Sequence, residues 1–454
     1  MQPQEPPLPQ TSRHDRRGAS VVLVVLTVLL LVGGLVTAGI RLTRDDAPSR
    51  TAPSLSTTPT TGASTTVPST VAGAAGEPAY ITQIKAQVSQ IRGLAWRAPL
   101  AVQVVSKPQL AQRVKQVTAR DAHPERIAGD EATLKVLHLI PRDLDYAKAI
   151  DDLLAEQVLG FYDPVTKELV VADAGGGEVA PDTKVSIAHE LDHALTDQYF
   201  DFGGRSQALD AADKEEEYGA FTALIEGDAV NLQLRWADAY LSADEQAAAL
   251  LGGGSQSSVL DRSPAYLRDS LLFPYTTGTQ FVAGLIDGKS FKRVDQAYLQ
   301  PPTSTEQILH PDLYNSGQGW VPPPLADVAA ATGCDPVRTN TLGEFTMKEL
   351  LVGAKNGGQG WNGDVFQTVR CGTALGVVDR WQTDTDDDAS RFEKALDSWA
   401  ATWSGSGRGP GADGRFSGPD GAGRITRNGS QVDILLADDA PTADRLQAAV
   451  GVLN

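Results

Sequence analysis

Apolar residues recur at helical spacing through much of the chain. Ile81, Ile84, Val88 and Ile91 stand three or four positions apart, which is the spacing of one face of an α-helix. The same kind of spacing predicts helices at residues 80–93, 144–159, 183–198 and 211–241. Short β-branched or alternating runs predict a strand at residues 102–105 and a hairpin at residues 160–173. Helices outnumber strands, so the pattern predicts an α+β fold in which a small mixed sheet accompanies a mostly helical domain.

The pattern changes near the N-terminus, where residues 19–40 are apolar and uncharged. At about 1.5 Å per residue, a helix of this length spans roughly 33 Å, close to the thickness of the hydrocarbon core of a bilayer. We therefore expect one transmembrane helix at residues 19–40, which anchors the protein in the cell membrane. Residues 1–18 would be cytoplasmic and the C-terminal domain extracytoplasmic. A cleaved signal peptide is the alternative, but its apolar region would be shorter.

Composition divides the rest of the chain into four parts. Residues 41–78 are rich in Ser, Thr and Pro and predict a disordered stalk, because such a segment cannot bury enough apolar surface to fold. Residues 79–403 carry most of the predicted elements and form the expected main domain. Residues 404–423 predict a Gly-rich linker, and residues 424–454 predict a small C-terminal segment of a β-hairpin and a helix.

The net charge and the cysteines limit the partners and the cellular compartments that are expected for the protein. The formal net charge of −18 disfavours nucleic acid as a partner, because an acidic surface repels phosphates. Cys334 and Cys371 are the two cysteines of the chain. An even count outside the cytoplasm favours a disulfide, and two buried free thiols are the alternative.

One short motif carries the candidate chemistry. His189-Glu190-Leu191-Asp192-His193 is an H-E-x-x-H sequence within a predicted helix. Residues four apart lie on the same face of a helix, so both imidazoles can reach one metal ion. Glu190 can then take a proton from a water molecule held by the metal. With 6 His in 454 residues, a chance match is expected on the order of a few times per thousand such chains. The motif predicts a Zn²⁺ site.

A catalytic zinc needs a third protein ligand. Glu226 on the following helix is the best candidate, because Ala223, Gly227 and Ala229 around it are small and allow a close approach to the motif helix. The alternative is that Glu226 is an ordinary charged residue of that helix. Four nearby carboxylates are rival ligands: Glu215, Glu216, Glu217 and Asp228.

These residues resemble a known group of enzymes. His189-Glu-x-x-His193 followed by Glu226-Gly-x-Ala229 is similar to the paired motifs of the gluzincin metallopeptidases, a branch of the peptidase MA-like superfamily. Tyr275-Thr-Thr-Gly278 is similar to a segment whose Tyr stabilises the oxyanion in the aminopeptidases of that group. The resemblance implies that Tyr275 does the same here; the alternative is that it packs after Pro274. The wider sequence is similar to uncharacterised bacterial membrane-anchored metallopeptidases.

The resemblance implies a fold and a reaction. The fold would be a mostly helical zincin-like metallopeptidase domain, with a small mixed sheet next to the active-site helix and one transmembrane helix before it. The enzyme would hydrolyse peptide or protein substrates. Gly160-Phe-Tyr-Asp-Pro164 lacks the Glu that binds a free amine in the aminopeptidases, so an endopeptidase is favoured. Residues 169–172 would pair with the substrate as an edge strand, and His310 is expected to be structural.

Two other functions stay open. One is a catalytically inactive, zincin-like surface module that binds a partner. The other is a zinc hydrolase that acts on a non-peptide substrate of the cell envelope. Glu190 favours an enzyme over a binding module, because a structural metal site does not need a general base.

Overall fold

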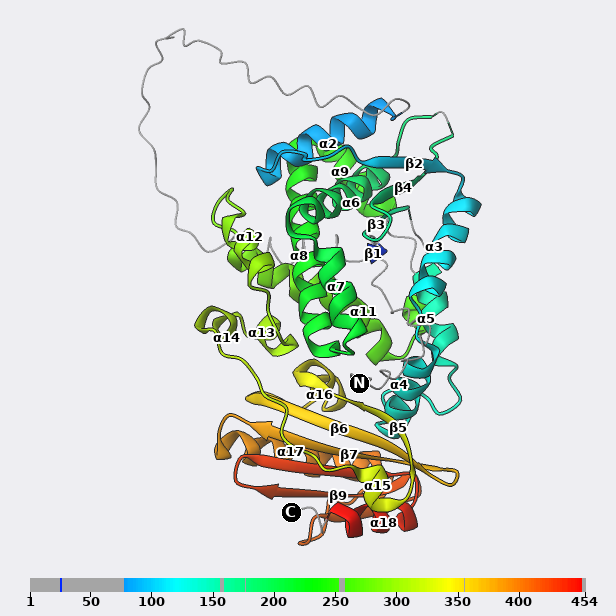
Figure 1. Ribbon diagram of the computed structural model, residues 1–454, viewed down its shortest axis with the longest axis vertical. Helices are drawn as coiled ribbons and strands as arrows, with labels where there is room; N and C mark the ends of the chain where they lie inside the picture. The colour runs from blue at the N-terminus through cyan, green and yellow to red at the C-terminus, as the bar shows by residue number, and fades with distance from the viewer. Residues whose placement is uncertain are drawn as a thin grey trace, which may run out of the picture.

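The computed structural model describes residues 25–26, 77–155, 159–175, 177–252, 258–354 and 356–450. Figure 1 shows two regions: a helical region with a small sheet, and a C-terminal region built on a larger sheet. The helices of the first region are α2 (Ala79–Arg92), α3 (Lys107–Asp121), α4 (Pro124–Val136), α5 (Tyr146–Ala155), α6 (Pro181–Phe200), α7 (Phe202–Ala211), α8 (Glu215–Tyr240), α9 (Ala243–Gly252), α10 (Ser258–Arg262), α11 (Ala265–Leu285), α12 (Lys292–Leu299), α13 (Thr305–Leu309) and α14 (Pro311–Ser316).

The core of the helical region forms around α6 and α8. All residues of α6 from Ser186 to Asp197 are buried, so this helix is enclosed on every side rather than on one apolar face. The middle of α8 is buried in the same way, from Ala220 to Gln233. α11 packs along α8, and α2 packs against both α6 and α8. A polar motif is therefore surrounded by the largest hydrophobic cluster of the described residues.

The small sheet has the strand order β1–β3–β4–β2. Its strands are β1 (Val25–Leu26), β2 (Ala101–Val105), β3 (Gly160–Asp163) and β4 (Glu168–Ala172). The hairpin predicted at residues 160–173 is confirmed as the antiparallel pair β3–β4. The prediction that residues 169–172 form an edge strand is wrong, because β4 is paired on both sides, with β3 and with β2. The outer edge of β3 instead pairs antiparallel with β1.

The C-terminal region contains a six-stranded antiparallel sheet in the order β5–β6–β7–β10–β9–β8. Its elements are α15 (Val328–Thr332), β5 (Asp335–Asn340), α16 (Gly343–Leu350), β6 (Trp361–Cys371), β7 (Ala374–Thr383), α17 (Asp386–Trp403), β8 (Arg415–Gly418), β9 (Gly421–Asn428), β10 (Gln431–Ala437) and α18 (Ala440–Val450). Neighbouring side chains of a strand point to opposite faces. On β10, Ile434 packs with α17 and α4, whereas Leu435 packs with α15 and α18.

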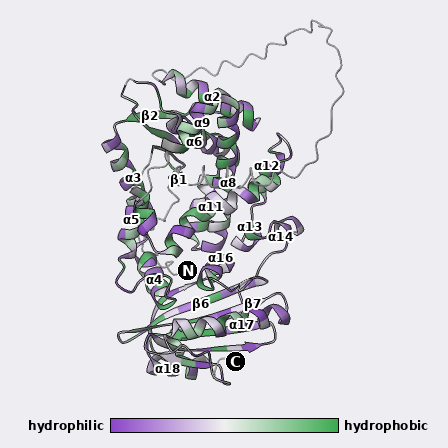
Figure 2. Ribbon diagram, turned by 180° about the vertical axis from the view of Figure 1, so that it is seen from behind, coloured by the Kyte–Doolittle hydropathy of each residue, from purple (hydrophilic) through white to green (hydrophobic). Residues whose placement is uncertain are grey.

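Helices therefore cover both faces of the large sheet. α17 lies across one face, and Figure 2 shows that it carries both hydrophilic and hydrophobic residues. Its buried residues Phe392, Leu396 and Trp403 follow helical spacing and contact the sheet. α4 of the helical region packs on the same face, so it links the two regions.

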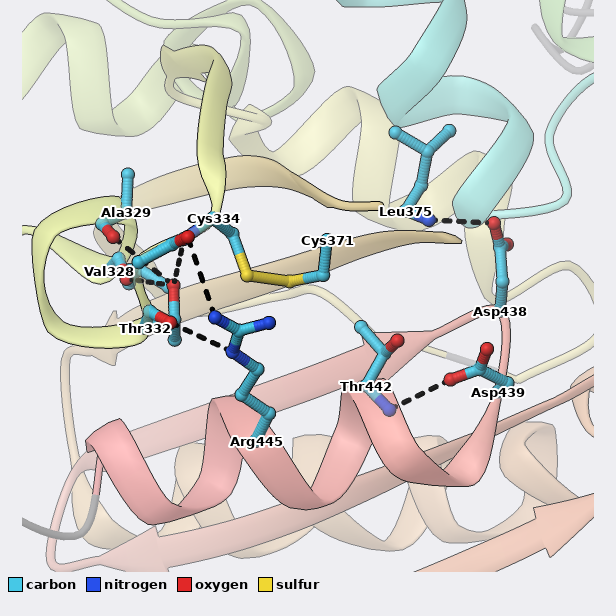
Figure 3. The surroundings of a disulfide bond; sticks show 11 residues. Val328, Ala329, Thr332, Cys334, Cys371, Leu375, Asp438, Asp439, Thr442 and Arg445 are labelled. Carbon is cyan, nitrogen blue, oxygen red and sulfur yellow. Dashed lines mark hydrogen bonds between the residues drawn. A yellow bond between two sulfur atoms is a disulfide. The ribbon is translucent and has the colours of Figure 1, made fainter. Parts of the chain in front are cut away.

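A disulfide joins Cys334 and Cys371, with their Cα atoms 4.7 Å apart, and confirms the predicted pairing (Figure 3). It connects the residue before β5 to the last residue of β6. Beside it, Arg445 of α18 donates a hydrogen bond of 2.8 Å to the carbonyl oxygen of Thr332 in α15. The disulfide joins the chain just before β5 to the end of β6, and the hydrogen bond joins α18 to α15 beside it.

The predicted fold class, a mostly helical zincin-like domain with one small sheet after a transmembrane helix, is wrong. The six-stranded sheet begins at Asp335, inside the predicted helical domain, and β9 and β10 from the predicted C-terminal segment are strands of the same sheet. The predicted linker at residues 404–423 contains β8 and the first residues of β9. Alternation was hard to see because several strands are buried on both faces, as β7 is.

The predicted transmembrane helix at residues 19–40 lies, apart from two residues, outside the described part of the chain. Within the part of the chain that the structure describes, no helix is both long and apolar enough to cross a bilayer. Val25 and Leu26, from the apolar run, form strand β1. The remaining residues of the run at 19–40 lie outside the described residues. So do the predicted cytoplasmic segment at residues 1–18 and residues 41–76 of the predicted stalk.

Candidate metal centre

Three of the predicted ligands meet in the core. His189 and His193 lie one turn apart on α6, and Glu226 faces them from α8. Their ligand atoms all lie within 4.8 Å of one another. Glu226 Oε2 is 3.1 Å from Nε2 of His189 and 3.5 Å from Nε2 of His193. All three residues are 0% exposed. Two imidazoles and one carboxylate form a typical ligand set of a catalytic zinc.

The surrounding hydrogen bonds fit a metal ion. Gln233, two turns after Glu226 on α8, places its Oε1 2.8 Å from Nδ1 of His189. If Nδ1 donates this bond, Nε2 of His189 carries a lone pair that points toward the other ligands. Both ring nitrogens of His193 and Oε1 of Glu226 are buried without a hydrogen-bond partner among the described residues. Buried polar atoms without partners are costly, and a cation between these three side chains would satisfy one ring nitrogen of His193 and an oxygen of Glu226.

The electrostatics favour the deprotonated forms that bind metals. Burial acts to raise the pKa of Glu226, but the neighbouring imidazoles of His193 and His189 lower it to about 2. Burial lowers the pKa of His193 below its usual value. A carboxylate beside neutral imidazoles is the state in which these groups can coordinate an ion.

Glu190 lies beside the three ligands and is also 0% exposed. Its Oε2 accepts a hydrogen bond of 2.8 Å from the backbone N–H of Tyr162 in β3, whereas its Oε1 has no partner among the described residues. Burial raises the pKa of Glu190 well above its usual value, although the bond from Tyr162 opposes this shift. One oxygen is thus held by the sheet and the other is free to accept a proton.

Tyr275 is brought to the same site by the packing of α11 on α8. Burial raises the pKa of its hydroxyl well above the usual value, and the charges of Glu226 and Glu190 and a hydrogen bond to Glu226 raise it further. The ring of Tyr275 stacks near that of His189, with 6.4 Å between the centroids. All five predicted site residues therefore lie together.

Two glycines explain how Tyr275 comes so close to Glu226. A Cβ atom at Gly227 of α8 would lie 2.3 Å from the carbonyl oxygen of Gly278 in α11, and one at Gly278 would lie 2.3 Å from that of Ala223. The two backbones are in direct contact at these positions, which only glycine permits. Ala223 and Gly227 thus serve the approach of α11, whereas the sequence suggested that the small residues around Glu226 serve the approach of α6.

A buried arginine contacts the motif at Asp192 and links it to two aspartates of other helices. Arg92 at the end of α2 lies 3.1 Å from Asp228 and 3.7 Å from Asp192, and it also contacts Asp295. Asp192 is 0% exposed, and neither of its carboxylate oxygens has a hydrogen-bond partner among the described residues. Asp197, one turn after His193, accepts hydrogen bonds of 2.7 Å from the Tyr162 hydroxyl and 3.0 Å from the backbone N–H of Gly203.

The other candidates lie elsewhere. Glu215, Glu216, Glu217 and Asp228 are not in the ligand cluster, so Glu226 is the carboxylate that the fold selects. His310 lies away from it and forms an ion pair of 2.9 Å with Glu344, which agrees with the structural role expected for it.

Sequence reasoning missed three residues that support the site: Arg92, Tyr162 and Gln233. Gln233 could have been found, because it is seven residues after Glu226 and therefore lies on the same helix face. Tyr162 acts through its backbone, and Arg92 comes from a distant helix, so neither position carried a signal in the sequence.

Comparisons with known proteins bear on the C-terminal region alone. Residues 332–449, which span the six-stranded sheet, match a domain of unknown function (DUF8575). The match does not include the metal centre. No curated protein and no solved structure matches the chain.

Proposed function

We propose that this protein is a zinc-dependent metallopeptidase, in which His189, His193 and Glu226 hold the ion and Glu190 is the general base. The observation that carries the proposal is the cluster of His189, His193 and Glu226, which has unpartnered buried atoms and lies next to the unpartnered Oε1 of Glu190. A structural metal site has no use for a buried carboxylate that is not a ligand, so Glu190 favours catalysis.

Each residue has a defined task. A bound zinc ion supplies Lewis acidity, which lowers the pKa of a water molecule toward about 7 and polarises a carbonyl group. Glu190 accepts the proton of the attacking water through its free Oε1 and passes it to the leaving amine. Tyr275 donates a hydrogen bond to the oxyanion that develops on the substrate. Gln233 keeps the imidazole of His189 in the orientation that binds metal.

The edge of β3 supports a peptide as the substrate. The backbone N–H of Tyr162 in β3 donates a hydrogen bond to Glu190, and the outer edge of β3 pairs with the extended segment Val25–Leu26. A substrate that took the place of Val25–Leu26 on this edge would lie beside the general base. Asp163, the acidic residue of β3, is bound by Arg120 at 2.9 and 3.2 Å. It is therefore not free to bind a terminal amine, which favours an endopeptidase.

The disulfide supports a location outside the cytoplasm, because such bonds persist in oxidising compartments. We keep this location as part of the proposal.

A second function is favoured by one observation. The three ligands and Glu190 are all 0% exposed, so a substrate can reach them only after a neighbouring segment moves. A protein that keeps the metal to stabilise a binding surface would need no such movement. The experiment below separates the two functions.

The test measures zinc content and peptide cleavage on the same samples of the full chain. Wild type should contain one zinc per chain and cleave peptides of a mixed library. Glu226→Ala should lose most of the zinc. Glu190→Gln should keep the zinc and the fold but lose hydrolysis, and Tyr275→Phe should lower kcat by about 10²–10³-fold. Glu217→Gln, on the same helix as Glu226 but outside the cluster, is the matched control.

Two results would overturn the proposal. Hydrolysis by Glu190→Gln at the wild-type rate would show that Glu190 is not the general base. A zinc-loaded wild type that cleaves no peptide would favour the binding module.

A further inference from the structure

A cavity of about 400 Å³ lies between the helical region and the C-terminal sheet. α8 and α11 form one wall, and the opposite wall comes from α16, the residues before it and β6. The opposite wall includes Leu342, Phe345 and Phe366, which belong to the segment that matches the domain of unknown function. The volume is within the range of about 300–1,000 Å³ that is typical of ligand sites.

The cavity leads toward the metal centre. Glu215, Gly219 and Thr222 of α8 line it, and Glu226 follows Thr222 by one helical turn on the same face. Tyr275 of α11 also lines the cavity, and its hydroxyl interacts with Glu226. A group in the cavity would therefore be separated from the metal ligands by about one turn of α8 and by the ring of Tyr275.

The chemistry of the walls is acidic and aromatic. Asp130, Glu215 and Glu216 contribute carboxyl groups, and none of the lining residues is Lys, Arg or His. Behind the cavity, Arg338 is shared between Asp130, Glu215 and Asp213. Arg126 also contacts Asp213 and is itself shared with Asp210, so two cations face four carboxylates. The remaining surface combines leucine, phenylalanine and tyrosine side chains with the hydroxyl groups of threonines and one serine.

An unpartnered hydroxyl points to a missing ligand. Thr222 is 5% exposed and lines the cavity, and its Oγ1 has no hydrogen-bond partner among the described residues. A buried hydroxyl without a partner costs free energy, and a polar group of a ligand in the cavity would remove this cost.

We propose that this cavity is a specificity pocket that takes a basic side chain, arginine or lysine, of the peptide substrate. Such a side chain has an apolar stem that can pack on the aromatic walls and a cationic end that the carboxylates of Asp130 and Glu215 can bind. The C-terminal domain then has a role, because it completes the pocket. This proposal rests on the proposed peptidase function for the identity of the ligand.

Binding tests the pocket without any need for catalysis. The probes are N-acetyl-arginine methylamide and N-acetyl-norleucine methylamide, and affinities for the full chain are measured by calorimetry with and without zinc. Wild type should bind the arginine probe about ten-fold or more tightly than the norleucine probe. Glu215→Gln, at a carboxylate that solvent can reach, should lose most of this preference. Glu217→Gln, two residues away and outside the cavity, should keep it.

A second variant is needed because Glu215→Gln can also act indirectly, by changing the position of Arg338. Thr222→Val removes the unpartnered hydroxyl without changing the charge, and it should weaken the arginine probe severalfold. Two results would show that the cavity is not a pocket for basic side chains. One is equal affinity of wild type for the two probes, and the other is an equal loss of preference in Glu215→Gln and Glu217→Gln.

Cleavage of peptides separates this proposal from the proposed function. If the enzyme cleaves peptides and prefers arginine or lysine at one position, both proposals stand. Cleavage without any preference for a basic residue overturns the pocket and leaves the peptidase. Tight, Glu215-dependent binding of the arginine probe by a protein that cleaves no peptide overturns the peptidase and keeps the pocket as a site for basic groups.

Discussion

The contact between α8 and α11 gives a sharp prediction for Gly278→Ala. In an ordinary helix interior, this change stabilises a protein by about 1 kcal/mol. Here the new Cβ would lie 2.3 Å from the carbonyl oxygen of Ala223 and 3.0 Å from its Cα. Ordinary contact begins at about 3.4 Å, so the two helices must separate by roughly 1 Å. Overpacking of this kind costs typically about 1–3 kcal/mol, so we expect net destabilisation.

Urea unfolding of the full chain measures this effect, and Gly284→Ala is the matched control. Gly284 lies on the same helix, and a Cβ there would meet nothing within 4 Å. The control should be as stable as wild type or slightly more stable, whereas Gly278→Ala should have a lower unfolding midpoint. It should also bind zinc more weakly, because Glu226 moves with α8. Gly278→Ala with wild-type stability and zinc affinity would refute the close contact of these helices.

Three further predictions concern other parts of the molecule. Burial raises the pKa of Glu216 from 4.5 to about 8, so the folded state keeps a proton that the unfolded chain releases. The free energy of unfolding should therefore fall by on the order of a few kcal/mol as the pH rises from 4.5 to about 8. In urea titrations at several pH values, Glu216→Gln should make the free energy of unfolding depend less on pH. Loss of the Cys334–Cys371 disulfide, with its sequence separation of 37, should cost about 3–4 kcal/mol, seen as a lower Tm of the Cys334→Ser/Cys371→Ser variant; an unchanged Tm would contradict this. Arg92→Met should cost about 3–5 kcal/mol in urea unfolding, because it leaves buried carboxylates such as Asp192 without their cation; an equally stable variant would contradict this reading.

The site could be predicted from the sequence to the extent that it depends on helix spacing. His189 and His193 are one turn apart, and that interval alone brings their imidazoles together on α6. Glu226 is on a separate helix and was predicted from the small residues around it, whereas a resemblance of short motifs was needed to add Tyr275. The spacing could not show that Gly227 meets Gly278, because that contact depends on the packing of two distant segments.

The fold was predicted less well, for a related reason. The helices α6 and α8 and the hairpin β3–β4 are local structures, and their residues carry a local pattern. The six-stranded sheet joins β7 to β10, across the whole of α17. β7 has almost no exposed residue, so it shows no alternation of polar and apolar positions. Long-range pairing of buried strands leaves little trace in a single sequence.

One helix links the large sheet to the metal centre. Glu216, near the start of α8, accepts hydrogen bonds of 2.6 and 2.8 Å from Thr305, and it packs against Gly343 at the start of α16. Glu226 lies on the same helix, about 15 Å further along at 1.5 Å per residue. A rigid helix transmits a shift of one end to the other. The C-terminal domain thus contacts the helix that carries Glu226, although it contributes no metal ligand among the described residues.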